Sequence, residues 1–125
     1  MERRLISSGS PYERRLGYSR AVRVGADVFV AGTAPIVLGG EPPEGAYAQA
    51  MRCFEIIAKA LEDAGARLEH VVRVRVYLTR AEDFDEVGRA HAEVFADIRP
   101  VNTTVIAQLL DPRWLVEIDV QAVVT

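Results

Sequence analysis

The residues best suited to chemistry are Asn102 and Glu117, which fall on two neighbouring predicted strands in the last quarter of the chain. Glu117 stands in the segment VEIDVQAVV, whose other residues are mainly apolar. A carboxylate in such a strand must face a solvated cleft, pair with a cation or have its pKa raised, because removing an unpaired charge from water is costly. Glu117 is therefore a candidate for positioning water or binding a ligand. A structural pairing with Arg73 or Arg75 across the sheet is the alternative.

The elements that must position these two residues follow from the spacing of apolar residues and turn formers. Alternating residues predict strands, and apolar residues at intervals of three and four predict helices. The sequence predicts a hairpin of strands 20–24 and 28–31, a helix from Tyr47 to about Leu61, a strand at 71–79, a helix at about 84–95, and strands at 102–109 and 115–124. This order predicts an α+β two-layer sandwich, in which a mixed sheet carries both helices on one face.

Two of the predicted strands each have an apolar face and a polar face. In the last strand the polar set is Glu117, Asp119 and Gln121, and the apolar set is Val116, Ile118, Val120 and Ala122. In strand 71–79 the polar set is Arg73, Arg75 and Tyr77, and the apolar set is Val72, Val74, Val76 and Leu78. Because successive side chains point to opposite faces, the apolar sets can pack against the helices and the polar sets share the other face. That face is either solvated or buried in an oligomer with its charges paired.

The composition excludes several classes of protein. A chain of 125 residues is expected to form one domain, residues 1–125. The formal charge of −3 argues against a general nucleic-acid binder, which normally carries a basic surface. No apolar run reaches the roughly 20 residues of a membrane helix. The N-terminal segment MERRLISSGSPYERR lacks the apolar centre of a signal peptide, so we expect a cytoplasmic protein with no membrane partner.

The cysteine and histidine residues show no spacing that would predict a disulfide or a metal site. Cys53 is the single cysteine, and its apolar neighbours at helical spacing predict a small buried side chain rather than a reactive thiol. His70 and His91 lie far apart in the sequence, so we expect no metal.

Arginines are most frequent near the N-terminus. This group is interleaved with Glu2 and Glu13 and consists of Arg3, Arg4, Arg14, Arg15, Arg20 and Arg23. Mixed charges of this kind predict a solvated, self-neutralising surface rather than a phosphate site.

Three segments of the chain, in their order and spacing, resemble the RidA/YjgF family of imine/enamine deaminases, which is also described as endoribonuclease L-PSP. The segments are PYERRLGYSRAVRVGADVFVAGTAP, ALEDAGARLEHVVRVRVYLTRAEDFDEV and the final segment from Pro100 through VEI. The resemblance implies the chorismate mutase-like fold and a homotrimer whose three sheets surround a central barrel. It also implies three clefts at the subunit interfaces, which bind a small-molecule substrate without a cofactor.

The resemblance assigns roles to individual residues. In the family, an arginine two residues after a proline grips the carboxylate of a 2-imino acid, and a glutamate fifteen residues further on positions the water that attacks the C=N carbon. Glu117 matches this glutamate, and Tyr18, within GYSRA, matches a tyrosine that lines the cleft. Gly32 and Thr33, within AGTAP, stand where the family contributes backbone contacts to the ligand.

Asn102 stands at the position of the family's arginine. A neutral asparagine offers neither the fixed charge nor the planar fork of a guanidinium. Losing a charge-assisted hydrogen bond costs about 1.5–3 kcal/mol, or roughly ten- to a hundred-fold in binding. Either the ligand carries no carboxylate at this place, or another cation such as Arg73 or Arg75 binds the carboxylate. The hydroxyl of Thr104 is expected to face the same cleft.

Three functions remain open. The first is a hydrolase of small imine, enamine or related compounds in which Glu117 positions water. The second is a non-catalytic trimer that binds a small molecule or regulates through it. The third, an endoribonuclease or translation inhibitor, is disfavoured because the chain is acidic and has no stripe of basic and aromatic residues.

Overall fold

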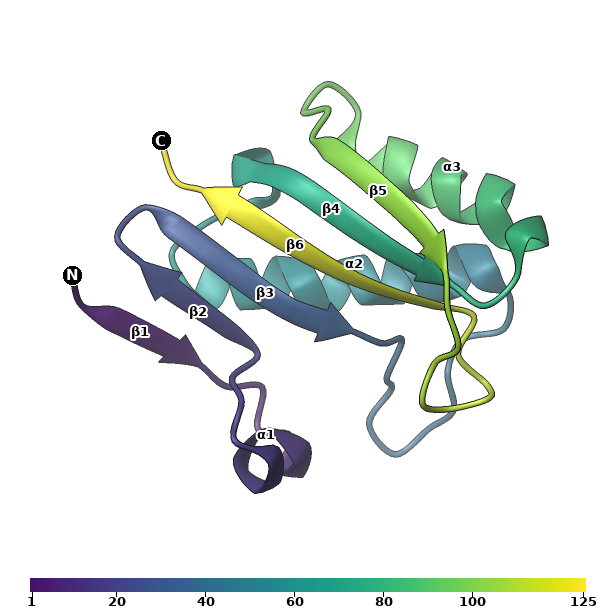
Figure 1. Cartoon of the computed structure of the whole chain (residues 1–125), viewed down its shortest axis with the longest axis horizontal. Helices are drawn as coiled ribbons and strands as arrows, with labels where there is room; N and C mark the ends of the chain where they lie inside the picture. The colour runs from purple at the N-terminus through teal and green to yellow at the C-terminus, as the bar shows by residue number, and fades with distance from the viewer.

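A computed structural model describes residues 1–125 and contains a six-stranded sheet with two long helices on one face (Figure 1). Both halves of the α+β prediction, the mixed sheet and the helices on one side, are confirmed. The elements in chain order are β1 (Arg3–Ile6), α1 (Pro11–Leu16), β2 (Ala21–Val24), β3 (Asp27–Thr33), α2 (Ala46–Asp63), η1 (Leu68–His70), β4 (Val71–Leu78), η2 (Ala81–Asp83), α3 (Phe84–Phe95), β5 (Val101–Ile106) and β6 (Val116–Val123).

The strand order of the sheet is β1-β2-β3-β6-β4-β5, and only β4 and β5 are parallel. The prediction that the strands of Asn102 and Glu117 are neighbours is therefore wrong, because β4 lies between β5 and β6. Parallel strands need a crossover connection, which is usually a helix. Here α3 connects β4 to β5, and β5 lies parallel to β4 at the outer edge of the sheet. The chain then turns back, and β6 fills the central position between β3 and β4 (Figure 1).

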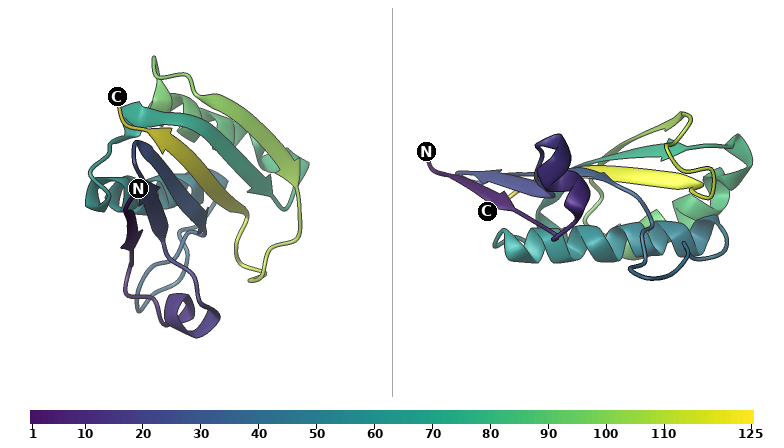
Figure 2. Two further views of the ribbon diagram at one scale, coloured as in Figure 1. Left: turned by 60° about the vertical axis from the view of Figure 1, so that its left-hand side comes forward. Right: turned by 90° about the horizontal axis from the view of Figure 1, so that it is seen from below.

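The core lies between the sheet and α2, which runs beneath the strands in the right-hand view of Figure 2. Its fully buried side chains include Ile57 and Leu61 of α2, Val74 of β4 and Ile118 of β6. Cys53 is also fully buried, and burial raises the pKa of its thiol. This agrees with the prediction of a small buried side chain rather than a reactive thiol. No helix here, α2 included, combines the length and the hydropathy that crossing a bilayer demands.

One residue of β4 departs from the predicted alternation. The pairing of β4 with β6 shifts register between Val71 and Arg73, so Val71 is buried and Val72 is 43% exposed. The prediction that Val72 packs against the helices is wrong, because an extra residue at a register shift moves its neighbours to the other face. From Val74 onward the predicted alternation holds, and the apolar set of β6 is buried throughout.

A short strand and a short helix near the N-terminus, β1 and α1, are absent from the sequence prediction. β1 is an edge strand in which only Ile6 is buried, so it shows no alternation that a pattern can detect. α1 begins at Pro11, after the side chain of Ser10 caps its first turn, and ends at Gly17, whose φ of 78° is left-handed.

The buried carboxylate of Glu13 holds α1 against the segment that follows β1. It accepts hydrogen bonds from the Ser7 hydroxyl at 3.0 Å, from the Ser8 amide at 3.1 Å and from the Ser8 hydroxyl. The backbone carbonyl of Glu13 also accepts from the amide of Tyr18 at 2.9 Å. This network fixes the loop that leads into β2.

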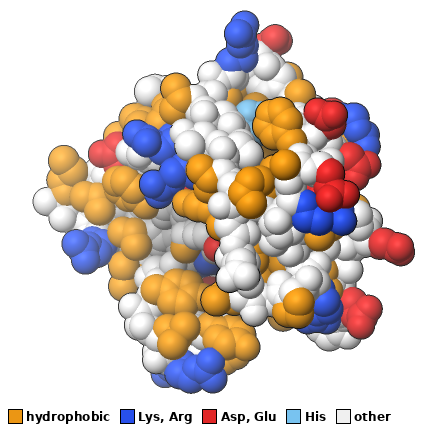
Figure 3. Space-filling view, turned by 45° about the vertical axis from the view of Figure 1, so that its right-hand side comes forward, with side chains coloured by type: hydrophobic (Ala, Val, Ile, Leu, Met, Phe, Trp, Pro, Cys, Tyr) orange, Lys and Arg blue, Asp and Glu red, His pale blue; other side chains and the backbone are white.

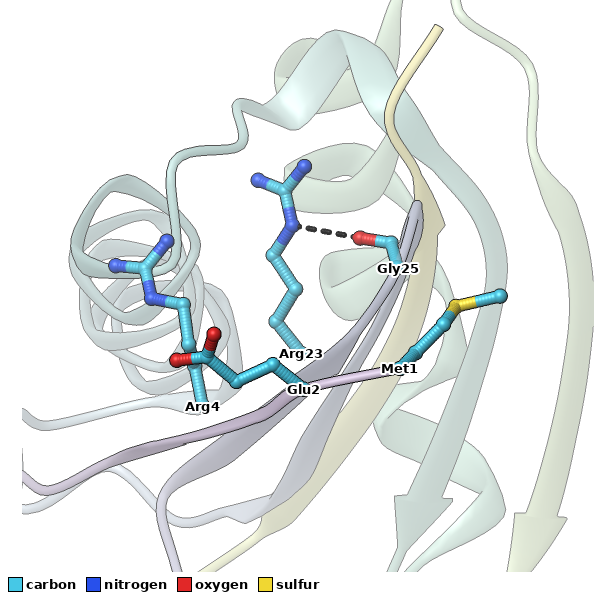
Figure 4. A pocket seen from close by; sticks show the side chains of 5 residues that line it. All are labelled: Met1, Glu2, Arg4, Arg23 and Gly25. Atoms are coloured by element: carbon cyan, nitrogen blue, oxygen red, sulfur yellow. Dashed lines mark hydrogen bonds between the residues drawn. The ribbon is translucent and has the colours of Figure 1, made fainter.

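Two of the N-terminal arginines bind the C-terminal end of α2. Arg4 donates to the carbonyl of Asp63 at 3.0 Å, and Arg23 donates to the carbonyl of Ala64 at 2.8 Å. Figure 4 shows both side chains beside the helix, with Arg23 also bonded to the carbonyl of Gly25. The last carbonyls of a helix lack partners within it and carry partial negative charge, so cations are favoured there. The prediction of a merely solvated surface is wrong for these two arginines.

We expect Arg23→Met to lower the free energy of unfolding by about 1–2 kcal/mol, because it removes charge-assisted hydrogen bonds from the end of α2. Urea denaturation at a fixed protein concentration measures this loss. Arg14→Met is the matched control, since Arg14 is exposed on α1 and makes no hydrogen bond. Equal losses in the two variants would show that the contacts with α2 contribute nothing.

Candidate functional site

Glu117 lies on the face of the sheet that carries no helix. It is half-buried, and its Cα partner on β4 is Tyr77. No ion pair or hydrogen bond engages its carboxylate, whereas the neighbouring Asp119 is fully engaged. Asp119 pairs with Arg75 at 2.9 Å and accepts a hydrogen bond from the Tyr77 hydroxyl at 2.8 Å. Glu117 therefore does not pair with Arg73 or Arg75.

The carboxylate of Glu117 lies directly over Gly32 at the end of β3. A Cβ added to Gly32 would overlap Oε2 of Glu117, so the absence of a side chain makes room for the carboxylate. The pairing of β3 with β6 shifts register between Val30 and Thr33, which places Gly32 in the irregular part of the strand. Close approach of another group, rather than an unusual φ, is the reason for glycine here.

Arg20 reaches the same glycine from the start of β2. One Nη donates to the carbonyl of Gly32 at 2.9 Å, and the other lies 3.5 Å from the hydroxyl of Thr33. The Nε of Arg20 is buried and has no hydrogen-bond partner. Sequence reasoning missed this residue, because it grouped Arg20 with the N-terminal arginines. Its position two residues after Tyr18, within GYSRA, is the one signal that could have marked it.

The surroundings of Glu117 act on its pKa in opposite directions. Partial burial raises the pKa of the carboxyl, and the charge of Asp119 raises it further. The positive charge of Arg20 lowers it and so partly offsets the burial. A half-buried carboxylate with a raised pKa and no fixed partner is suited to accept and return a proton.

Thr33 and Tyr18 are placed differently from each other. The side chain of Thr33 is fully buried and its hydroxyl donates to the carbonyl of Ala31 at 2.8 Å, so only its backbone can meet a ligand. Tyr18 is 42% exposed, and its hydroxyl makes no hydrogen bond within the chain. Tyr18 therefore stands at the surface on the loop that also carries Arg20.

Asn102 and Thr104 lie on the other face of the sheet from Glu117. Their Cα partners are Val74 and Val76, whose side chains pack toward the helices. The hydroxyl of Thr104 donates to Oδ1 of Asn102 at 2.8 Å. Two strand spacings, roughly 10 Å, separate β5 from β6. One copy of the chain thus brings Arg20, Gly32 and Glu117 together but does not bring Asn102 or Thr104 to them.

His91 of α3 is a packed residue. Its ring lies 4.7 Å from the Phe95 ring and 6.2 Å from the Phe54 ring, measured between centroids. Burial lowers the pKa of its imidazole, and its Nε2 is buried without a partner. A neutral imidazole held among phenylalanines is not part of the Glu117 site.

Comparison with known proteins gives consistent results. The sequence profile of the family described as Endoribonuclease L-PSP matches residues 11–124. An uncharacterized protein of Streptomyces coelicolor, SCO2049, is 41% identical over 123 residues, which cover 95% of this chain and 90% of that protein. A RutC family protein of Pyrococcus abyssi is 35% identical over 108 residues, covering 82% of each. The crystal structure of Rv2704 from Mycobacterium tuberculosis, a member of the YjgF/YER057c/UK114 family, superposes with a TM-score of 0.91 at 43% identity, covering 98% of this chain and 100% of that one.

We expect Glu117→Gln to melt at the same temperature as the wild type or higher at about pH 7. Because the folded state raises the pKa of Glu117, it binds more protons than the unfolded state between the ordinary and the raised pKa. Wild-type stability therefore falls as the pH rises through that window, and the glutamine variant escapes the loss. The advantage should disappear below about pH 4.5, where both states are protonated.

Thermal melts across this pH range test the expectation. Asp119→Asn is the matched control, and it should melt lower than the wild type because it breaks the pair with Arg75 and Tyr77. A lower melting temperature for Glu117→Gln at neutral pH would assign Glu117 a structural role.

Proposed function

Because the chain belongs to the Endoribonuclease L-PSP family, which includes the YjgF/YER057c/UK114 proteins, we propose that it binds a small metabolite and hydrolyses an imine, enamine or related compound without a cofactor. The observation that carries the proposal is the state of Glu117, a half-buried carboxylate without a cation partner, lying over Gly32. Structural carboxylates elsewhere in the chain, such as Glu13 and Asp119, are fully hydrogen-bonded. We further propose that residues 1–125 act as one domain in the cytoplasm.

In the proposed reaction Glu117 activates water for attack on the C=N carbon. The imine reacts as its protonated form. As the C–O bond forms, the carboxylate takes a proton from the water and the π electrons of the C=N bond move to nitrogen, which gives a neutral amino group. Glu117 then gives this proton to the amino group, and the C–N bond breaks as ammonia or an amine leaves. The carboxylate takes the hydroxyl proton as the carbonyl forms and releases it to the departing amine or to solvent. An enamine enters the same path after a proton adds to its carbon.

The complete cleft in this proposal forms between two copies of the chain. Asn102 and Thr104 face away from Glu117 in one copy, so a neighbouring copy must bring its β5 edge to Gly32 and Glu117. The surface supports such contact, because the face without helices and the β5 edge expose Phe29 at 47%, Val101 at 65% and Val105 at 43%. Figure 3 shows hydrophobic side chains spread over the side of the molecule to which β5 belongs, with basic and acidic groups among them. Three copies around these surfaces make the homotrimer that we propose.

The neutral side chain of Asn102 makes standard 2-imino acid deamination a poor fit. Its Oδ1 already accepts from Thr104, which leaves only the amide NH₂ to meet a ligand. A guanidinium at this position would supply a charge-assisted bidentate grip on a carboxylate. The substrate is therefore proposed to be a C=N or enamine compound that does not depend on a carboxylate held at residue 102.

A non-catalytic trimer that binds or senses a metabolite is the second candidate, and Asn102 favours it, since it replaces the arginine that the resemblance makes central. Activity that depends on Glu117 separates the two. A third activity, as an endoribonuclease or translation inhibitor, receives less support, because the net charge is −3 and the arginines Arg4 and Arg23 are engaged with α2.

We expect a homotrimer in solution. Light scattering at micromolar concentration should give three times the chain mass of 13.8 kDa. The reason is the face without helices, which combines exposed apolar side chains with paired charges. Val101→Asp places a charge at the β5 edge and should dissociate the assembly, whereas Leu38→Asp, at an exposed loop residue, should not. A monomeric wild type would rule out a cleft between subunits.

We expect hydrolysis of 2-imino acids to be about ten- to a hundred-fold slower than in relatives with the arginine, because the guanidinium is missing. Imines are made in situ by an amino-acid oxidase, or by an amine oxidase for neutral imines, and are trapped with semicarbazide. Asn102→Arg should raise the rate for imino acids, and Gln108→Arg, which adds the same charge just beyond β5, should not.

The same assay tests the proposed hydrolase. The wild type should accelerate hydrolysis of neutral imines, and Glu117→Gln should remove that acceleration. No acceleration with either class of imine would leave the ligand-binding trimer as the better account.

A further inference from the structure

Arg20, which directly precedes β2, and Glu117 of β6 converge on a single residue, Gly32. The guanidinium donates to the carbonyl of Gly32 at 2.9 Å, and the carboxylate lies over its Cα. Yet no ion pair joins the two side chains, although each is held close to the same backbone unit. The charge of Arg20 nevertheless acts on Glu117, because it lowers the pKa of the carboxyl.

Both groups have unused hydrogen-bonding capacity. A guanidinium carries five N–H donors, and Arg20 uses one on Gly32 and one in a long contact with Thr33. Its Nε is buried and unpartnered, which is costly unless a ligand or water accepts from it. The carboxylate of Glu117 accepts no hydrogen bond from the chain. Arg20 therefore keeps further Nη donors, and Glu117 keeps acceptors, close to the same glycine.

The charge of this neighbourhood sums to zero. Arg20 and Glu117 offset each other, and Asp119 is matched by Arg75. A ligand carboxylate placed against Glu117 would meet a like charge with no second cation to offset it, because residue 102 is neutral.

We infer that Arg20 and Glu117 bind the neutral amide edge of the ligand, with its carbonyl oxygen on the guanidinium and its N–H on the carboxylate. This inference rests on the proposed function, in which the reacting carbon lies beside Glu117, and it narrows the substrate class to neutral amide- or urea-bearing imines and enamines. Arg20 is then the residue that determines specificity. Arg20 lies at a different position from the family arginine, whose place is taken by Asn102, and it binds an amide carbonyl instead of a carboxylate.

Binding of an unreactive probe tests the inference without requiring turnover. Propionamide and propionate have nearly the same shape and differ in charge and in the N–H donor. Titration of the ¹⁵N-labelled full-length protein, followed by NMR chemical shifts, should give an affinity for propionamide about ten-fold or more above that for propionate. Arg20→Gln should weaken propionamide binding about ten-fold, since a charge-assisted hydrogen bond is lost. Arg14→Gln, the same change at an exposed arginine, should leave both affinities as they are.

Equal or tighter binding of propionate by the wild type, or unchanged propionamide binding by Arg20→Gln, would overturn the inference. If Arg20→Gln does not fold, Glu117→Gln decides. It removes the repulsion of an anion, so its preference for propionamide over propionate should fall about ten-fold or more, and an unchanged preference would overturn the inference.

Failure of the proposed function leads to a different result. Amide binding that depends on Arg20, together with no hydrolysis of any imine, would leave this binding site in a protein without the proposed chemistry. Hydrolysis that depends on Glu117, together with amide affinity that does not depend on Arg20, would retain the function and reject the inference.

Discussion

The close approach of the Glu117 carboxylate to the backbone of Gly32 is the contact on which the arrangement of the site depends. The carboxylate occupies the space that any side chain at residue 32 would need, and the irregular pairing of β3 with β6 lies at this point. The carbonyl of the same glycine accepts a hydrogen bond from Arg20. One residue without a side chain therefore sets how an anion and a cation lie relative to each other, and the central strands of the sheet hold it in place.

This arrangement requires a sheet that is covered on one side only. α2 covers the apolar face of β6, so Glu117 and Asp119 must turn to the other face. There the chain supplies partners for Asp119 but none for Glu117. An unpaired, half-buried carboxylate costs stability, and such groups are concentrated at functional sites because binding or proton transfer makes use of them. The contrast between two carboxylates two residues apart on one strand is stronger support for function at Glu117 than its burial alone.

The sequence is sufficient to predict which side chains of β6 face the helices, because a period of two persists wherever a strand is regular. The predicted alternation is wrong at Val72, because a register shift turns this side chain to the other face of the sheet. No local signal in the sequence marks the shift. The prediction is also wrong for the neighbours of β6, since residues close in sequence suggest a hairpin although the parallel return through α3 places β5 beyond β4. Arg20 is missed for a third reason. Its contacts join separate strands, and its sequence neighbours suggest only a group of solvated arginines.

In the proposed site residue 102 is neutral, and Arg20 supplies a positive charge near Glu117. In the proposed trimer, a guanidinium on β5 of a neighbouring copy would face Glu117 across the cleft, which suits a charged group held between them. A guanidinium beside Glu117 instead presents donor and acceptor on the same wall, which suits the edge of a neutral amide. Under the proposed function, Glu117 over Gly32 is the group that activates water, and Arg20 is the group that selects the substrate. The proposal therefore assigns to Asn102 an effect on the choice of ligand rather than on the attack of water, because the half-buried carboxylate of Glu117 has no cation partner of its own.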